Sequence, residues 1–293
     1  MEWFSIALLS SFLSAFAAIA QKKVLFTKGA FEFSLLLSIA NLLFSIPFFF
    51  MIDFGTLNSF NLSILFIKSI IGVGSFLCVM TALKNLQISS ALPLLALTPG
   101  FVAIFAFLFL GESLKLAEIL GLVSFMAGVY ILESKNLKDI FSAFNVFTKS
   151  KHHRYILGAL ILFTVSSVMD KFLLSKMKLT PISLTAFQHL FFAIIFGLIY
   201  SYLRAGKKEY SIELPKKEIG WIVLISFLTI GYRLVQAIAT SGGSVALTLA
   251  IKRTSVFWAT VIGGTIFKDT GLIKKIIAVI FILLGAILIL RFN

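Results

Sequence analysis

The sequence predicts an all-α membrane protein whose ten transmembrane helices form two inverted five-helix repeats. Three observations lead to this fold class: the composition, the spacing of apolar runs, and a likeness between the two halves of the chain. The chain has 293 residues, of which 59% are apolar and 13% charged, and its mean hydropathy is +1.05. Soluble domains carry about 25% charged residues, so this chain has too little charge to cover a water-facing surface.

Ten apolar runs are long enough to cross a bilayer as helices, because about 17–25 residues span the hydrocarbon core. The runs are 3–20, 33–51, 62–83, 87–110, 115–132, 155–174, 181–203, 219–240, 244–267 and 271–290. Strands of a membrane barrel would instead alternate in polarity over about 10 residues. The pattern therefore favours a helical bundle.

The last part of each half is similar in sequence. Residues 82–132 align with residues 239–290 at an offset near 157, and this alignment places Glu112 on Asp269. A unit of five spans that occurs twice must enter the membrane from opposite faces, because five is an odd number. Such inverted repeats place a binding site near the middle of the membrane, at the interface between the repeats.

The first part of each half aligns at an offset near 149, which pairs Lys22 with Lys171. We therefore divide the chain into a first repeat (1–132), a linker (133–154) and a second repeat (155–293). In the linker, apolar residues recur at helical spacing among lysines, which is typical of a basic amphipathic helix lying in the membrane interface. A plain linker is the alternative.

The two-times-five layout carries short motifs, "LFLGE" in the first half and "TIFKD" in the second. In this order they resemble the EamA-type branch of the drug/metabolite transporter superfamily. The resemblance covers nearly the whole chain and implies a secondary transporter of small organic solutes. Because members of that branch differ widely in substrate, the resemblance names no solute.

The charge is strongly basic, with 26 Lys and Arg against 12 Asp and Glu. Most basic residues lie between the apolar runs, where they meet lipid headgroups, so we expect membrane lipids and no nucleic acid as partners. Numbering the loops in chain order, the odd-numbered loops hold seventeen Lys and Arg, and the even-numbered loops and termini hold five. This bias predicts cytoplasmic odd loops and outside termini, whereas the resemblance implies cytoplasmic termini. A prokaryotic-type plasma (inner) membrane is the expected location.

Polar and ionisable groups within spans are expensive and mark functional sites. With a rise of about 1.5 Å per residue, the polar groups in the spans of the second half lie at similar depths in the membrane, measured from the even-numbered loops. The candidates for substrate contact are Lys252, Arg253, Arg233, His189, Gln188, Tyr232, Gln236 and Lys68, and those for coupling or ion pairing are Asp170 and His189. The excess of cations predicts an anionic ligand, because Arg and Lys both bind carboxylate and phosphate.

Adjacent Lys252 and Arg253 also resemble the Lys-Arg pair that the phosphate-translocating plastid branch of the superfamily places on its ninth span. Each candidate has a structural alternative. In these alternatives, the ammonium of Lys68 extends to the membrane interface by snorkelling, and Arg233 pairs with Asp170. His189 is then a packing residue rather than a proton-coupling group. A purely structural role is the alternative for Lys252 and Arg253 as well.

No set of residues has the spacing of a metal site or of a phosphate-binding loop, so we expect no enzyme, no metal and no cofactor. Glu112 and Glu118 lie at a junction between spans and suit helix ends better than acid–base chemistry. Cys78 is the single cysteine, which excludes an internal disulfide.

The expected function is transport of a small organic anion, phosphorylated or carboxylate, by alternating access. Three alternatives remain open: a flippase for an anionic lipid headgroup, an exporter of amino acids or other metabolites, and a non-transporting membrane scaffold or receptor. A monomer completes the inverted pair, and a homodimer is the other option.

Overall fold

The structure is a computed structural model that describes residues 2–86, 95, 98–133, 151–206, 217–266, 281, 284, 285 and 288. All regular elements in these ranges are helical. The first half contains α1 (Glu2–Leu25), α2 (Ala30–Phe49), a short 3₁₀ helix (Phe54–Thr56), α3 (Ser59–Asn85), α5 (Thr98–Leu110) and α6 (Leu116–Glu133). The second half contains α8 (Lys151–Ser175), α9 (Pro181–Gly206), α10 (Ile219–Gly242), α11 (Val245–Lys252), α12 (Thr254–Trp258), a π-helical turn (Ala259–Gly263) and α13 (Gly264–Ile266).

Seven helical segments are long and apolar enough to cross a membrane. They are α1, α2, α3, α8, α9, α10 and the segment Val245–Gly263, and each corresponds to a predicted span. In the regions of the other three predicted spans, α5 and the apolar part of α6 (Leu116–Gly128) are shorter, and most of 271–290 lies outside the described residues. The chain is thus a multi-pass helical membrane protein, and the count of ten stays a prediction.

Two predicted boundaries differ from those of the structure by four residues or more. Helix α1 continues beyond residue 20 to Leu25, so Lys22 and Lys23 lie on a helix rather than in a loop. Helix α8 begins at Lys151, so the last four residues of the predicted linker belong to it. The apolar runs are shorter than both helices. A helix can continue past its apolar part because the charged ends of long basic side chains reach polar groups. The predicted interfacial helix falls on 134–150, outside the described residues.

Many hydroxyl side chains inside the spans bond to the backbone of their own helices. Ser34 Oγ donates to the carbonyl of Ala30 at 2.7 Å, Ser69 Oγ to that of Leu65 at 2.7 Å, and Thr164 Oγ1 to that of Leu160 at 2.8 Å. A helix satisfies its own backbone groups, which is the condition for crossing hydrocarbon. These serines and threonines are satisfied in the same way, so they do not require polar partners on other helices.

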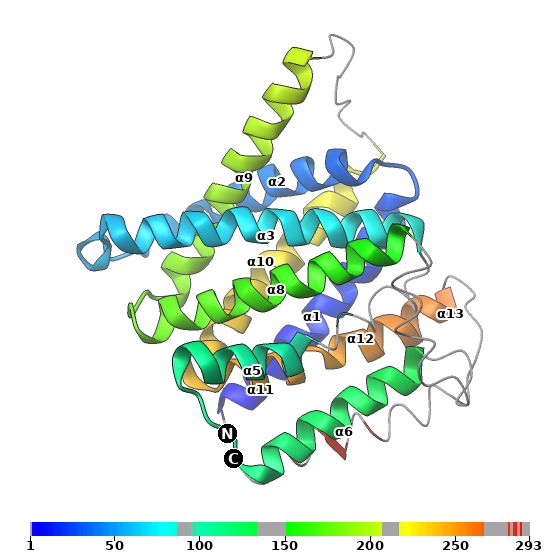
Figure 1. The fold of residues 1–293 in the computed structure, drawn as a ribbon. Helices are drawn as coiled ribbons and strands as arrows, with labels where there is room; N and C mark the ends of the chain where they lie inside the picture. The colour runs from blue at the N-terminus through cyan, green and yellow to red at the C-terminus, as the bar shows by residue number, and fades with distance from the viewer. Residues whose placement is uncertain are drawn as a thin grey trace.

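The helices pack in a pattern that is symmetric between the two halves. The most extensive contacts join α1 to α10 and α3 to α8, which lie side by side in Figure 1. The helices that correspond in the two halves are α1 and α8, α2 and α9, α3 and α10, and α5 and α11. When each helix is replaced by its counterpart, the contact of α1 with α10 becomes the contact of α8 with α3. The contacts of α5 with α8 and of α10 with α2 have their counterparts in α11 with α1 and α3 with α9. This symmetry indicates that the two halves have similar folds, and their inverted orientation in the membrane stays a prediction.

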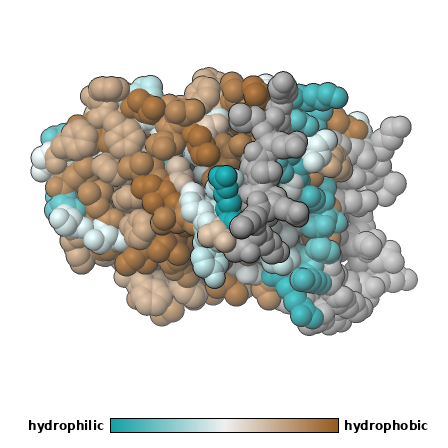
Figure 2. Space-filling model, turned by 90° about the horizontal axis from the view of Figure 1, so that it is seen from above, coloured by the Kyte–Doolittle hydropathy of each residue, from teal (hydrophilic) through white to brown (hydrophobic). Residues whose placement is uncertain are grey.

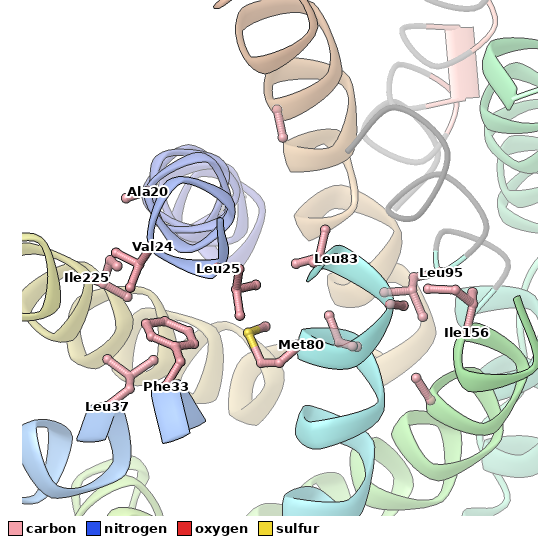
Figure 3. Packing of buried hydrophobic residues seen from close by; sticks show 14 of the residues in the cluster. Ala20, Val24, Leu25, Phe33, Leu37, Met80, Leu83, Leu95, Ile156 and Ile225 are labelled. Carbon is pink, nitrogen blue, oxygen red and sulfur yellow. The ribbon is translucent and has the colours of Figure 1, made fainter. Parts of the chain in front are cut away.

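The largest buried apolar cluster lies where α1, α2, α3 and α10 meet. Figure 3 shows Leu25, Phe33 and Met80 converging from three different helices, with Val24 and Ile225 beside them. The outer surface is also apolar. Phe50 is 87% exposed and Phe109 71% exposed, and Figure 2 shows apolar side chains over most of the described part of the face seen from above. Such a surface matches lipid rather than water.

Helices α3 and α9 approach closely at Gly72. A Cβ atom there would lie 2.7 Å from Cζ of Phe192, whereas one at Gly197 of α9 would have no neighbour within 4 Å. We expect Gly72→Ala to lower the free energy of unfolding by about 1–3 kcal/mol, because it overpacks this contact. Gly197→Ala is the control and raises it by up to about 1 kcal/mol. Thermal unfolding of both variants in detergent checks this, and equal effects would contradict it.

Candidate functional site

The most deeply buried charge is the ammonium group of Lys68 on α3, whose side chain is fully enclosed. Lys68 Nζ lies 2.7 Å from Oδ1 of Asp170 on α8 and donates a hydrogen bond of 2.5 Å to Oε1 of Gln188 on α9. One ammonium group therefore ties a helix of the first half to two helices of the second half. The predicted snorkelling of Lys68 to the interface is wrong, because the ammonium is held inside the bundle.

The predicted pairing of Asp170 with Arg233 is also wrong. Asp170 pairs with Lys68, and among the described residues no carboxylate forms an ion pair with Arg233. The single carboxylate of this region serves the cation that is completely enclosed, because a buried charge without a partner costs several kcal/mol. The side chain of Arg233 is only partly buried within the bundle, so its charge needs a carboxylate partner less than the enclosed charge of Lys68 does.

Lys252 and Arg253 lie at an interruption of the ninth predicted span, where α11 ends and α12 begins. Arg253 has φ −69° and ψ −8°, and its N–H bonds to the carbonyls of both Leu249 and Ala250. The helix tightens for one residue at this point, and a π-helical turn follows at Ala259–Gly263. Irregular turns within a helix are common at functional positions.

The two side chains reach different neighbours. Lys252 Nζ donates to Oε1 of Gln236 and lies 4.8 Å from the ring centre of Tyr232, both on α10. Arg253 Nη2 donates to Oγ1 of Thr98 on α5 at 3.4 Å, and its guanidinium lies 5.7 Å from the ring centre of Phe163 on α8. Every one of these described partners is uncharged. Thr98 and Phe163 were not predicted, since nothing in the sequence relates them to Arg253.

Two small cavities flank a layer formed by Gln188, His189 and Arg233, which line both of them. The cavity nearer the even-numbered loops is also lined by polar groups of Asp170, Thr185, Gln236 and Thr240. The cavity nearer the odd-numbered loops is also lined by polar groups of Ser34, Ser38, Asn41, Thr229 and Tyr232. Each has room for about one water molecule. An organic solute therefore requires the helices to move apart.

Several polar atoms of this layer have no hydrogen-bond partner among the described residues. They are both ring nitrogens of His189 and the amide nitrogen of Gln188, and Nε of Arg253 nearby has none either. His189 and Gln188 are each 2% exposed. Buried polar atoms are nearly always hydrogen-bonded in proteins, so this layer has unused capacity for a ligand or ordered water.

The structure thus brings together six of the predicted site residues, Gln188, His189, Arg233, Tyr232, Gln236 and Asp170, as lining of the two cavities. Lys252 contacts Gln236, which lines one cavity, and Tyr232, which lines the other, but it lines neither cavity itself. Lys68 and Arg253 are likewise absent from both linings. Within the described ranges, no three His, Cys, Asp or Glu residues are grouped as metal ligands.

Comparison with known families agrees with this arrangement. The model of the EamA-like transporter family matches residues 1–134 and 153–291. The chain belongs to the EamA-like transporter family. Members of this family are transporters rather than enzymes, and the resemblance stated from the motifs is confirmed.

A solved crystal structure has the same fold as this member of the EamA-like family. It aligns with a TM-score of 0.72 over 98% of this chain and 96% of the other, at 16% sequence identity. At that identity the likeness establishes the fold alone. A search of the curated proteins found no match.

The buried pair of Lys68 and Asp170 yields a prediction about stability. We expect Asp170→Asn to lower the free energy of unfolding by about 3–5 kcal/mol, because it leaves an enclosed ammonium without its counter-charge. The double variant Lys68→Met, Asp170→Asn removes that charge and recovers part of the loss. Thermal unfolding in detergent measures both. If the double variant lost as much free energy of unfolding as Lys68→Met and Asp170→Asn lose together, the two charges would not be coupled.

Proposed function

We propose that this protein is a secondary-active transporter that moves a small organic anion, phosphorylated or carboxylate, by alternating access. One observation supports the choice of an anion. Arg233, Lys252 and Arg253 lie in membrane-spanning helices, and among the described residues none of them forms an ion pair with a carboxylate. The one carboxylate beside them, Asp170, is already paired with Lys68.

The energetic argument concerns the cost of these cations. A basic side chain at the centre of a membrane helix costs about 2.5–3.5 kcal/mol on insertion scales. Neutral partners such as Gln236 and Thr98 offset only part of that cost, since they contribute dipoles and no charge. An anionic solute between the helices supplies the missing charge, and it gains strong hydrogen bonds from Lys and Arg donors. Lys252 and Arg253 are proposed to hold the anion, with Arg233 assisting.

The remaining candidate residues have neutral or coupling roles in this proposal. His189 and Gln188 separate the two cavities and offer unused donors or acceptors to a bound solute. Tyr232 and Gln236 hold Lys252 until the anion arrives. Because the packing of the two halves is symmetric, rocking of one half against the other exposes this layer first to one side and then to the other.

The proposal predicts that anions stabilise the purified protein. A ligand present at 100 times its dissociation constant adds about 2.7 kcal/mol to the free energy of unfolding. We expect this stabilisation from inorganic phosphate, phosphorylated metabolites or dicarboxylates, measured as a thermal shift in detergent. Lys252→Ala and Arg253→Ala each weaken it by about tenfold or more in affinity, because a hydrogen bond to a charged group is worth about 1.5–3 kcal/mol.

Lys176→Ala, which removes an exposed lysine outside the site, is the matched control and leaves the shift unchanged. We expect uptake of the same anion into proteoliposomes to fall in Lys252→Ala and Arg253→Ala and to stay unchanged in Lys176→Ala. Stabilisation by amines alone overturns the proposal. Stabilisation by phosphatidylglycerol alone favours the flippase, and a phenotype that depends on residues 133–154 but not on Lys252 favours a scaffold or receptor.

A further inference from the structure

A second set of charged contacts lies at the turn between α10 and α11, outside the proposed anion site. Lys171, the residue after Asp170 on α8, donates from Nζ to the carbonyl of Thr240 at 3.0 Å and to that of Gly243 at 2.6 Å. The last carbonyls of a helix have no partner within the helix, and a basic side chain can satisfy them. Lys171 therefore fixes the end of α10.

Glu112 holds the other side of the same turn. Its Oε2 accepts hydrogen bonds from Oγ of Ser244 at 3.0 Å and from the N–H of Val245 at 3.2 Å, at the start of α11. Its Oε1 lies 3.7 Å from Nζ of Lys171. Glu112 follows α5 in the first half, whereas Lys171 and the turn belong to the second half. The contacts thus join the two halves at one end of the bundle.

This turn follows the last residue of α10 that lines the cavity nearer the even-numbered loops. Thr240, whose carbonyl accepts from Lys171, also lines that cavity together with Asp170. The side chain of Trp3 packs against the outside of the turn, since a Cβ atom on Gly243 would lie 2.8 Å from its ring. For a solute to pass on this side, the turn has to move away from α8 and α5.

The opposite end of the bundle has an equivalent contact. Lys22 on α1 donates from Nζ to the carbonyl of Leu83 at 2.5 Å and to that of Leu86 at 2.8 Å, at the end of α3. The offset of 149 relates Lys22 to Lys171, and the offset of 157 relates Leu83 and Leu86 to Thr240 and Gly243. Two lysines in equivalent positions therefore hold the ends of two equivalent helices, on opposite sides of the membrane.

We propose that these lysines are the two gates of the carrier. We call the contacts of Lys171 and Glu112 the even-side latch and the contacts of Lys22 the odd-side latch. The even-side latch breaks when the carrier opens toward the even-numbered loops, and the odd-side latch breaks when it opens toward the odd-numbered loops. Opening on the even side then moves the end of α10, and opening on the odd side moves the end of α3. The inference rests on alternating access, but not on the chemical nature of the solute.

The test measures access to each cavity by thiol labelling in detergent, without added solute. In a Cys78→Ser background, Thr240→Cys reports opening on the even side and Ser38→Cys reports opening on the odd side. We expect Glu112→Gln to raise the labelling rate at Thr240→Cys by about tenfold and to lower it at Ser38→Cys, since weakening one closed end shifts the population toward opening there. Lys22→Met has the opposite effect on the two reporters.

Asp53→Asn is the control. The carboxylate of Asp53 lies in the loop between α2 and α3, where it accepts a hydrogen bond from the N–H of Gly55 at 3.0 Å, and the substitution leaves both labelling rates unchanged. Lys171→Met serves as a second even-side variant if Glu112→Gln does not fold. Equal increases at both reporters indicate general loosening and overturn the proposal, as does no change at either. Anion binding is measured separately, so a failure of the proposed solute class leaves this result interpretable.

Discussion

The structure depends on the fact that Lys68 is fully enclosed among apolar helices. An ammonium group in that position needs a counter-charge, and Asp170 supplies it at 2.7 Å while Gln188 accepts a further hydrogen bond. This requirement fixes the approach of α3 to α8 and α9. It also engages Asp170, so among the described residues Arg233, Lys252 and Arg253 form no ion pair with a carboxylate. The hydrogen-bond partners of Lys252 and Arg253 are uncharged.

The same turn of α8 serves two purposes. Asp170 faces Lys68 and the cavity, and Lys171 faces the end of α10. Adjacent residues on a helix point about 100° apart, so one turn contacts the proposed site and the proposed latch together. A movement of this turn therefore displaces Asp170 and Lys171 together. No longer chain of contacts is needed between the site and the even-side latch.

Much of this arrangement was predictable from the sequence, but not the choice of partners. Apolar runs located seven spans, and helical rise placed Arg233, Lys252 and His189 near the same depth. Depth along a helix does not determine which neighbour a side chain meets. That depends on α3 packing along α8, which no periodicity encodes. The sequence therefore suggested Arg233 as one alternative partner for Asp170 and did not suggest Lys68. Glu112 was correctly expected at a helix end, yet its contact with Lys171 joins segments 59 residues apart.

Neutral partners suit a cation that must bind and release a solute. Lys252 is held by the amide oxygen of Gln236 and the ring of Tyr232. In the proposed binding step, an anion that reaches Lys252 replaces a hydrogen bond to a neutral amide oxygen with a hydrogen bond between opposite charges, which adds Coulomb attraction. The net gain is the difference between the two, and so it is smaller than the full strength of an ion pair. A carboxylate in place of Gln236 would compete with the solute on equal terms. An apolar residue there would leave the ammonium unsatisfied whenever the solute departs. In the proposed transport cycle, the amide avoids both extremes and brings the empty and loaded states closer in free energy.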